Sequence, residues 1–139
     1  MKIFLSAFLF LTIFFTEASA QKKSKPRHST AAKKPVIKYG TASFYAAKFE
    51  KRQTASGEIY RSKKYSAACN VLPLHTWIKV TNLRNDKSVI VKINDRLHSK
   101  NKRLVDLSRI AAKELGFISK GLIRVKIEVL NNFHLVSEK

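Results

Sequence analysis

The chain has 139 residues, which is enough for one domain with its own core and for terminal segments, but a second folded domain is not expected. Its 28 Lys and Arg outnumber its 9 Asp and Glu, and the net charge of +19 favours anionic partners such as cell-wall polymers, lipid head groups or nucleic acid. The single cysteine, Cys69, excludes an internal disulfide. The four histidines show no metal-ligand spacing, so neither a metal nor another cofactor is expected.

The first 38 residues divide into an apolar segment and a basic one. Residues 1–20 are typical of a secretory signal, because a lysine precedes an apolar run and Ala-Ser-Ala at positions 18–20 suits cleavage. The apolar run is shorter than the about 20 residues that a membrane-spanning helix needs. Export and cleavage before Gln21 are therefore expected. Residues 21–38 hold seven Lys or Arg and two Pro, which predicts a flexible basic linker.

Residues 39–130 carry the patterns of one mostly β domain. Alternating or aromatic-rich runs predict strands at residues 39–45, 65–68, 77–83 and 121–130, and from residue 88 to the turn at residues 94–96. A polar stretch at residues 48–64 predicts a long ordered loop, and residues 84–87 a hairpin turn. Residues 106–115 predict a helix with Ser108 or Asp106 as cap and Gly116 as stop. Many short strands with so little helix indicate a small closed barrel, followed by a tail at residues 131–139.

Asp95 is the first candidate for chemistry. Val89, Val91 and Ile93 alternate as one face of a strand, and the strand stops at Asn-Asp-Arg, residue types that favour turns. A carboxylate at a strand end is presented to a loop by a rigid scaffold, which suits a functional site. The alternative is that Asp95 only bonds amides of its own turn and pairs with Arg96.

Seven short motifs occur along the domain in the order seen in one protein family. They lie at residues 40–45 (GTASFY), 54–58 (TASGE), 72–73 (LP), 80–83 (VTNL), 94–96 (NDR), 105–108 (VDLS) and 115–116 (LG). In these motifs the chain resembles RlpA-like (rare lipoprotein A) proteins, and the resemblance covers residues 39–130.

The resemblance implies a fold, a location and a reaction. The implied fold is a small six-stranded double-psi β-barrel with one or two short helices, as in barwin and in the first domain of expansins. The implied location is the bacterial periplasm or cell envelope, and the implied partner is the peptidoglycan glycan strand. A monomer is expected. The implied reaction is lytic transglycosylation, which cleaves the glycan after N-acetylmuramic acid while the sugar's own 6-hydroxyl closes an anhydro ring.

The resemblance also assigns site residues. Asp95 matches the family's conserved acid, and one carboxylate suffices if it gives a proton to the leaving oxygen and then accepts the proton of the attacking hydroxyl. Ordinary glycosidases need two carboxylates. Glu58 matches the family's functional Glu and is expected to face the same cleft; the alternative is a surface acid paired with Lys51, Arg52 or Arg61. Asp106 is expected to cap the helix.

Five further residues complete the predicted substrate-binding set, which consists of Tyr45, Phe44, Arg96, His98 and Cys69. The two aromatic rings are placed either against sugar faces or in the core. Anionic cell-wall polymers are a second expected partner, and specific nucleic-acid binding is not expected because no nucleic-acid-binding signature is visible.

Three departures from the family pattern bear on activity. Cys69 stands where the family has His, His75 stands where it has Gly, and Leu97-His98 replaces Gly-Pro. A neutral thiol is a weaker hydrogen-bond partner than an imidazole, so Cys69→His is predicted to raise cleavage unless His98 supplies the lost imidazole. These departures leave an alternative function, an expansin-like module that binds or loosens the wall without cutting it.

Overall fold

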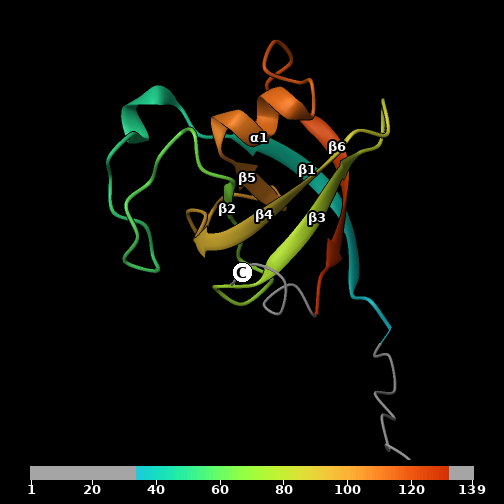
Figure 1. Ribbon diagram of the computed structural model, residues 1–139, viewed down its shortest axis with the longest axis horizontal. Helices are drawn as coiled ribbons and strands as arrows, with labels where there is room; N and C mark the ends of the chain where they lie inside the picture. Colours follow the sequence, from blue (N-terminus) through green and yellow to red (C-terminus); the bar gives the residue numbers. More distant parts are fainter. Residues whose placement is uncertain (1–33, 132–139) are drawn as a thin grey trace, which may run out of the picture. The chain divides into compact units, whose positions relative to one another are not determined.

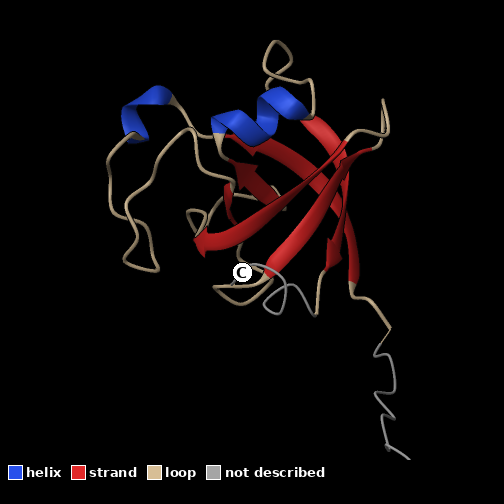
Figure 2. Ribbon diagram, in the orientation of Figure 1, coloured by secondary structure: helices blue, strands red, loops and turns tan. Residues whose placement is uncertain are grey.

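The computed structural model describes residues 34–131, and it confirms the predicted mostly β fold. Within these residues six strands close into one barrel in the order β1-β5-β2-β4-β3-β6 (Figures 1 and 2). The strands are β1 Ile37–Phe44, β2 Ser66–Ala68, β3 Trp77–Asn82, β4 Ser88–Asp95, β5 Val105–Leu107 and β6 Ile123–Val129. The helical segments are η1 Ala47–Phe49 and α1 Arg109–Glu114. The predicted signal segment and most of the predicted linker and tail lie outside the described residues.

The strand pairing brings three strand ends together at one edge of the barrel. β1 runs parallel to β5, and β2 runs parallel to β4, whereas the other neighbours are antiparallel. In the resulting register Ser43 lies opposite Asp106, and Ala68 lies opposite both Asp106 and Asp95. The last residues of β1, β2 and β4 therefore meet beside β5. The loop that runs from β1 to β2 leaves the barrel at this edge (Figure 1).

The core follows from the alternation that the sequence shows. Inward residues of the strands are buried, α1 adds Ala111 and Ala112 from its inner face, and Leu115, the residue after the helix, is buried with them. Phe117, which follows the helix, is the largest of the fully buried side chains. Such close packing of apolar side chains is the main source of stability in a domain without a disulfide. Among the residues described, no helix is long and apolar enough to cross a membrane.

The region before α1 differs from the sequence prediction. Asp106 does not cap the helix, because residues 105–107 form strand β5, and the Asp106 carboxylate accepts two hydrogen bonds from the Arg103 guanidinium at 2.7 and 2.8 Å. Ser108 is the N-cap residue, but its side chain makes no capping hydrogen bond. The helix ends as predicted, since Gly116 has a φ of 73°, a conformation that favours glycine. β1 begins at Ile37, two residues before Tyr39, because Ile37 and Lys38 still pair with β6.

Candidate active site

The Asp95 carboxylate, at the end of β4, is held from three directions. Its Oδ1 atom accepts hydrogen bonds from the backbone N–H groups of Ala55 and Arg96, each at 2.8 Å. Its Oδ2 atom accepts one from the Tyr45 hydroxyl at 2.6 Å. The predicted bond to an amide of its own turn is present, but no ion pair joins it to the Arg96 guanidinium among the described contacts. The carboxylate is thus fixed by its own turn, by the end of β1 and by the loop at residues 54–58.

Asp95 lies in a cleft of about 660 Å³ at the edge where the strand ends meet. The charged side chains that line the cleft are Asp95, Asp106, Lys48, Arg52, Arg96 and Arg103. Its aromatic side chains are Phe44, Tyr45, Phe49 and Tyr60, and His98 also lines it. The structure therefore brings four of the predicted substrate-binding residues to the same cleft as Asp95, and it leaves Glu58 and Cys69 outside.

Tyr45 acts on Asp95 through its hydroxyl group. Burial, followed by the hydrogen bond to Asp95, raises the pKa of Tyr45 far above its ordinary value of 10.0, so the hydroxyl remains a donor at physiological pH. The Tyr60 ring stacks on the Tyr45 ring at 4.4 Å, and the Phe49 ring meets it edge-on at 5.7 Å. One face of Tyr45 is thus covered. In this structure its hydroxyl holds the carboxylate, and the face covered by Tyr60 is closed to a sugar ring.

Phe44 is mainly a core residue. It packs against the buried cluster, and its ring meets that of Phe117 edge-on at 5.6 Å. The Arg109 guanidinium lies 5.8 Å from the centre of the Phe44 ring. Of the two placements that the sequence left open, the core placement is the one that accounts for most of its contacts, although part of the ring reaches the cleft.

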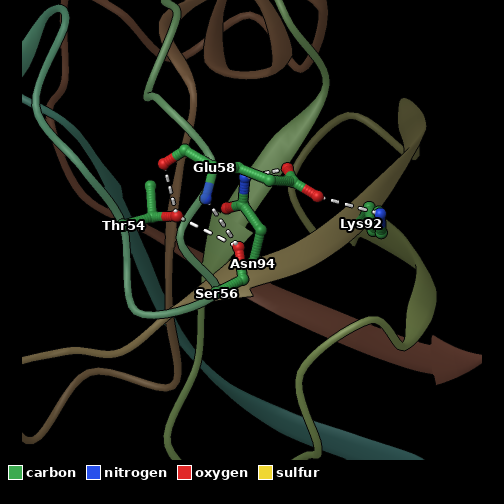
Figure 3. A network of polar contacts seen from close by, with 5 residues as sticks. All are labelled: Thr54, Ser56, Glu58, Lys92 and Asn94. Atoms are coloured by element: carbon green, nitrogen blue, oxygen red, sulfur yellow. Dashed lines mark hydrogen bonds and ion pairs between the residues drawn. The ribbon is translucent and has the colours of Figure 1, made fainter.

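Glu58 lies beside the cleft and not in it. Its carboxylate accepts hydrogen bonds from Asn94 Nδ2 at 2.9 Å and from Lys92 Nζ at 3.0 Å (Figure 3). It lines a neighbouring hollow with Lys92 and Trp77. The expected shared cleft with Asp95 is therefore not formed, and the ion pair is with Lys92 rather than with Lys51, Arg52 or Arg61.

The pKa of Glu58 is lowered, first by the Asn94 hydrogen bond and then by Lys92, while partial burial opposes the shift. The carboxyl group is therefore ionised at neutral pH and has no proton to give. What it does is hold Asn94, the residue before Asp95. Asn94 O also accepts a hydrogen bond from Ser56 N at 3.0 Å. Together with the Asn94–Glu58 bond and the bond from Ala55 N to Asp95, this ties the loop at residues 54–58 to the end of β4 three times.

Cys69 does not contact the cleft. Its side chain is 0% exposed and belongs to the core, so in this structure the thiol is closed off from the cleft where a substrate contact was predicted. Its backbone serves the site instead. Cys69 N donates to Asp95 O at 3.1 Å, and Cys69 O accepts a hydrogen bond from the Arg96 guanidinium.

Arg96 lines the cleft with a guanidinium that is already engaged. Besides Cys69 O, its Nη1 atom donates to Leu72 O at 2.8 Å. Next to it, the Asn70 side chain accepts from Leu97 N at 2.9 Å and donates to Leu97 O at 3.2 Å. These bonds fix the turn after β2 against the segment that follows Asp95. The Arg96 guanidinium therefore stabilises the backbone around the site, because its Nη1 atom is already bonded to two carbonyl groups.

Two histidines mark the family departures. His98 is exposed at the cleft, and its Nδ1 atom accepts a hydrogen bond from Lys100 N at 3.2 Å, which leaves an N–H on Nε2 when the ring is neutral. His75 has a φ of 67°, a conformation that glycine adopts without strain, and glycine is the residue that the resemblance expects at this position. His98 is therefore the imidazole that the structure offers to a ligand in this cleft.

The sequence did not single out Asn94, the Arg103–Asp106 pair or the rim formed by Lys48, Phe49 and Arg52. The rim cations both lie 5.5 Å from the centre of the Phe49 ring. Asn94 stands within the NDR motif, so its place beside Asp95 was a usable signal. The rim lies on the polar loop, whose path depends on tertiary contacts. Across residues 34–131 no group of three His, Cys, Asp or Glu gathers as a metal site would require.

Glu58→Gln is expected to make the barrel less sensitive to acid. Because the folded pKa of Glu58 lies below its ordinary value of 4.5, the ionised carboxylate contributes stability above that pH and loses it as the pH falls through the lowered pKa. The wild type should exceed the variant in unfolding free energy near pH 7, by less than about 1 kcal/mol for so exposed a pair, and the gap should close in acid. Urea unfolding at pH 7 and pH 3 measures this, and an unchanged gap at both pH values would contradict it.

Fold and site together define the class of protein. Residues 37–127 match the family model described as lytic transglycolase, a double-psi β-barrel family, and the chain belongs to this family. The match confirms the barrel type and the relationship that the seven motifs predicted.

Within the family the chain is similar to RlpA proteins. It is 52% identical over 98 residues to the endolytic peptidoglycan transglycosylase RlpA of Haemophilus influenzae. The aligned region covers 70% of this chain and 34% of that protein. It is 39% identical over 109 residues to the protein of the same name from Neisseria meningitidis. That aligned region covers 78% of this chain and 44% of that protein. The chain therefore spans less than half the length of these curated relatives.

Solved structures with low sequence identity share the fold. Streptomyces papain inhibitor matches with a TM-score of 0.57 and 18% identity, over 68% of this chain and 94% of that one. The expansin of Clavibacter michiganensis matches with a TM-score of 0.54 and 18% identity, over 70% of this chain and 52% of that one. At this identity the likeness shows the fold alone, and it agrees with the predicted relationship to expansin barrels.

Proposed function

We propose that this chain is a peptidoglycan lytic transglycosylase that acts in the bacterial cell envelope, with Asp95 as its catalytic acid and base. The observation that carries the proposal is the asymmetric binding of the Asp95 carboxylate. Oδ1 accepts two amide N–H groups, whereas Oδ2 accepts only the Tyr45 hydroxyl. Oδ2 therefore keeps a second lone pair, on which a proton can be held and from which it can be transferred.

The reaction needs no water and no second carboxylate. Protonated Asp95 gives its proton to the glycosidic oxygen after N-acetylmuramic acid, and the bond between C1 and that oxygen breaks. The 6-hydroxyl of the same sugar then bonds to C1 and releases its proton to the ionised Asp95. The products are a 1,6-anhydro end and a free hydroxyl, and Asp95 returns to its protonated form. The three donors on the carboxylate offset the negative charge that it carries between the two steps.

The other residues position this carboxylate or the glycan. Tyr45 holds Oδ2, and Glu58 acts through Asn94 on the end of β4. His98 offers an N–H to the sugar and so replaces the histidine that the family has at the position of Cys69. The rim cations Lys48 and Arg52 suit a polymer that carries carboxylates on its peptide stems. Two features of the cleft thus suit peptidoglycan: the Asp95 carboxylate suits its glycosidic bond, and the rim cations suit the carboxylates of its peptide stems.

The second candidate function is an expansin-like module that binds the wall without cleaving it. The replacement of the family His by the buried Cys69 favours it, because one polar group of the usual site is missing. The two candidates differ in what they do to purified glycan strands and not in whether they bind them.

Incubation of the full chain with glycan strands stripped of peptides separates the candidates. Mass spectrometry of the soluble products is expected to show fragments with anhydro ends, each lighter by one water than the corresponding reducing-end fragment. Reducing-end fragments would indicate hydrolysis with a water-activating group and contradict the proposed mechanism. Sedimentation with the strands without any release would establish the expansin-like module instead.

A further inference from the structure

A second hollow lies away from the Asp95 cleft, between the β3–β4 turn and the loop that joins α1 to β6. Both segments project from the same end of the barrel (Figure 1). The hollow measures about 430 Å³. Its lining residues are Thr41, Leu83, Arg84, Lys120, Leu122, Ile123 and Arg124, and none of them lines the Asp95 cleft. A ligand bound here would therefore leave the proposed active site open.

Two leucines at this end of the barrel are held on the surface by the backbone conformation. Leu83 is 44% exposed and Leu122 is 55% exposed. Leu122 precedes the buried Ile123, so the alternation of the strand turns it outward. Leu83 N donates to Arg124 O at 3.1 Å, which fixes the turn against β6. Their exposure is thus part of a fixed surface, and the two leucines line the same hollow, so their side chains can enter one interface together.

The rim of the hollow is cationic. Arg84, Lys120 and Arg124 surround the leucines, and none of them is in an ion pair among residues 34–131, where the pairs are Lys92–Glu58, Arg103–Asp106 and Lys126–Glu128. Asp86 is the one acidic residue in the turn and loop that flank the hollow. This end of the barrel therefore combines exposed aliphatic side chains with unneutralised positive charge.

We propose that this end of the barrel docks on the surface of an anionic phospholipid bilayer. Leu83 and Leu122 enter the interface, while Arg84, Lys120 and Arg124 bind lipid phosphates, with their aliphatic stems along the hollow. A soluble polyanion would need the cations but not the leucines. A second copy of the chain would bring two sets of the same cations together, and like charges oppose such an interface. The proposal is independent of the glycan chemistry.

Tryptophan emission tests whether this end enters the bilayer. Leu122→Trp places a probe at the surface, and Val71→Trp places one at a side chain of matched exposure, 54%, outside the hollow. With the full chain on vesicles containing phosphatidylglycerol, only Leu122→Trp should gain blue-shifted emission and quenching by brominated acyl chains. The native Trp77 gives the same background in both variants.

A charge test complements the probe. Arg84→Glu combined with Lys120→Glu should weaken vesicle binding by about 25-fold or more, because each basic residue at an anionic surface contributes on the order of fivefold. The matched pair Lys63→Glu with Lys64→Glu, outside this hollow, should lose only the few-fold effect of lower net charge.

Three outcomes would overturn the proposal. Equal losses in the two charge variants, or binding without any change in Leu122→Trp emission, would show attraction by net charge alone. A blue shift that grows with protein concentration in the absence of vesicles would assign the surface to a second copy of the chain.

Discussion

Asp95→Asn is expected to reduce the anhydro product by about 10²-fold to 10⁴-fold, the contribution typical of a positioned general acid or base, while the barrel stays folded. The amide keeps the shape of the side chain, and its oxygen can still accept from Ala55 N and Arg96 N. The –NH₂ group then faces the Tyr45 hydroxyl, which can accept as well as donate. What the variant loses is the proton that the reaction requires.

The control for Asp95→Asn is Asp86→Asn, which removes the same charge from an exposed turn. Asp86 has a φ of 57°, which asparagine also tolerates, so the control should fold and cleave like the wild type. The readouts are product mass spectrometry and co-sedimentation with glycan. If Asp95→Asn still released anhydro ends at the wild-type rate, Asp95 would not be the catalytic group, and if both variants lost activity equally, net charge would explain the effect.

The barrel could be predicted because its strands obey local rules. Alternation at Ile78 and Val80, and at Val89, Val91 and Ile93, places those side chains in the core whatever else the chain does. Strand β5 was missed because it is three residues long and its parallel partner β1 lies about sixty residues earlier. Its pairing is a tertiary property, and Asp106 therefore read as the cap of the adjacent helix.

The location of the site in the chain could be predicted from the sequence, but the contacts of its side chains could not. Asp95 stands at a strand end, which the sequence shows, but its bond to Tyr45 spans 50 residues and depends on barrel closure. The same holds for Glu58, because motif order cannot say that its carboxylate points to Asn94 and Lys92 and away from the cleft. For Cys69 the burial of the side chain, which sequence comparison does not give, reverses the expected effect of restoring histidine.

Cys69→His is now expected to destabilise the barrel rather than to raise cleavage. The thiol is 0% exposed within the core, and an imidazole is larger and carries two nitrogens that need partners. Overpacking costs about 1–3 kcal/mol, and burying a polar group without a partner costs about 1–3 kcal/mol more. A loss of roughly 2–6 kcal/mol in the free energy of unfolding follows.

The same substitution should also lower turnover, because the Cys69 backbone is part of the support of Asp95. An enlarged side chain would push the Cys69 carbonyl away from the Arg96 guanidinium and the Cys69 N–H away from Asp95 O. Cys69→Ala is the matched control: it keeps both backbone contacts and removes only the sulfur, so it should cost about 1 kcal/mol and retain cleavage. Urea unfolding and the anhydro-product assay measure both variants. A Cys69→His protein with an unchanged midpoint and more product would show that the core opens to place the imidazole in the cleft, and that the thiol is what limits this site.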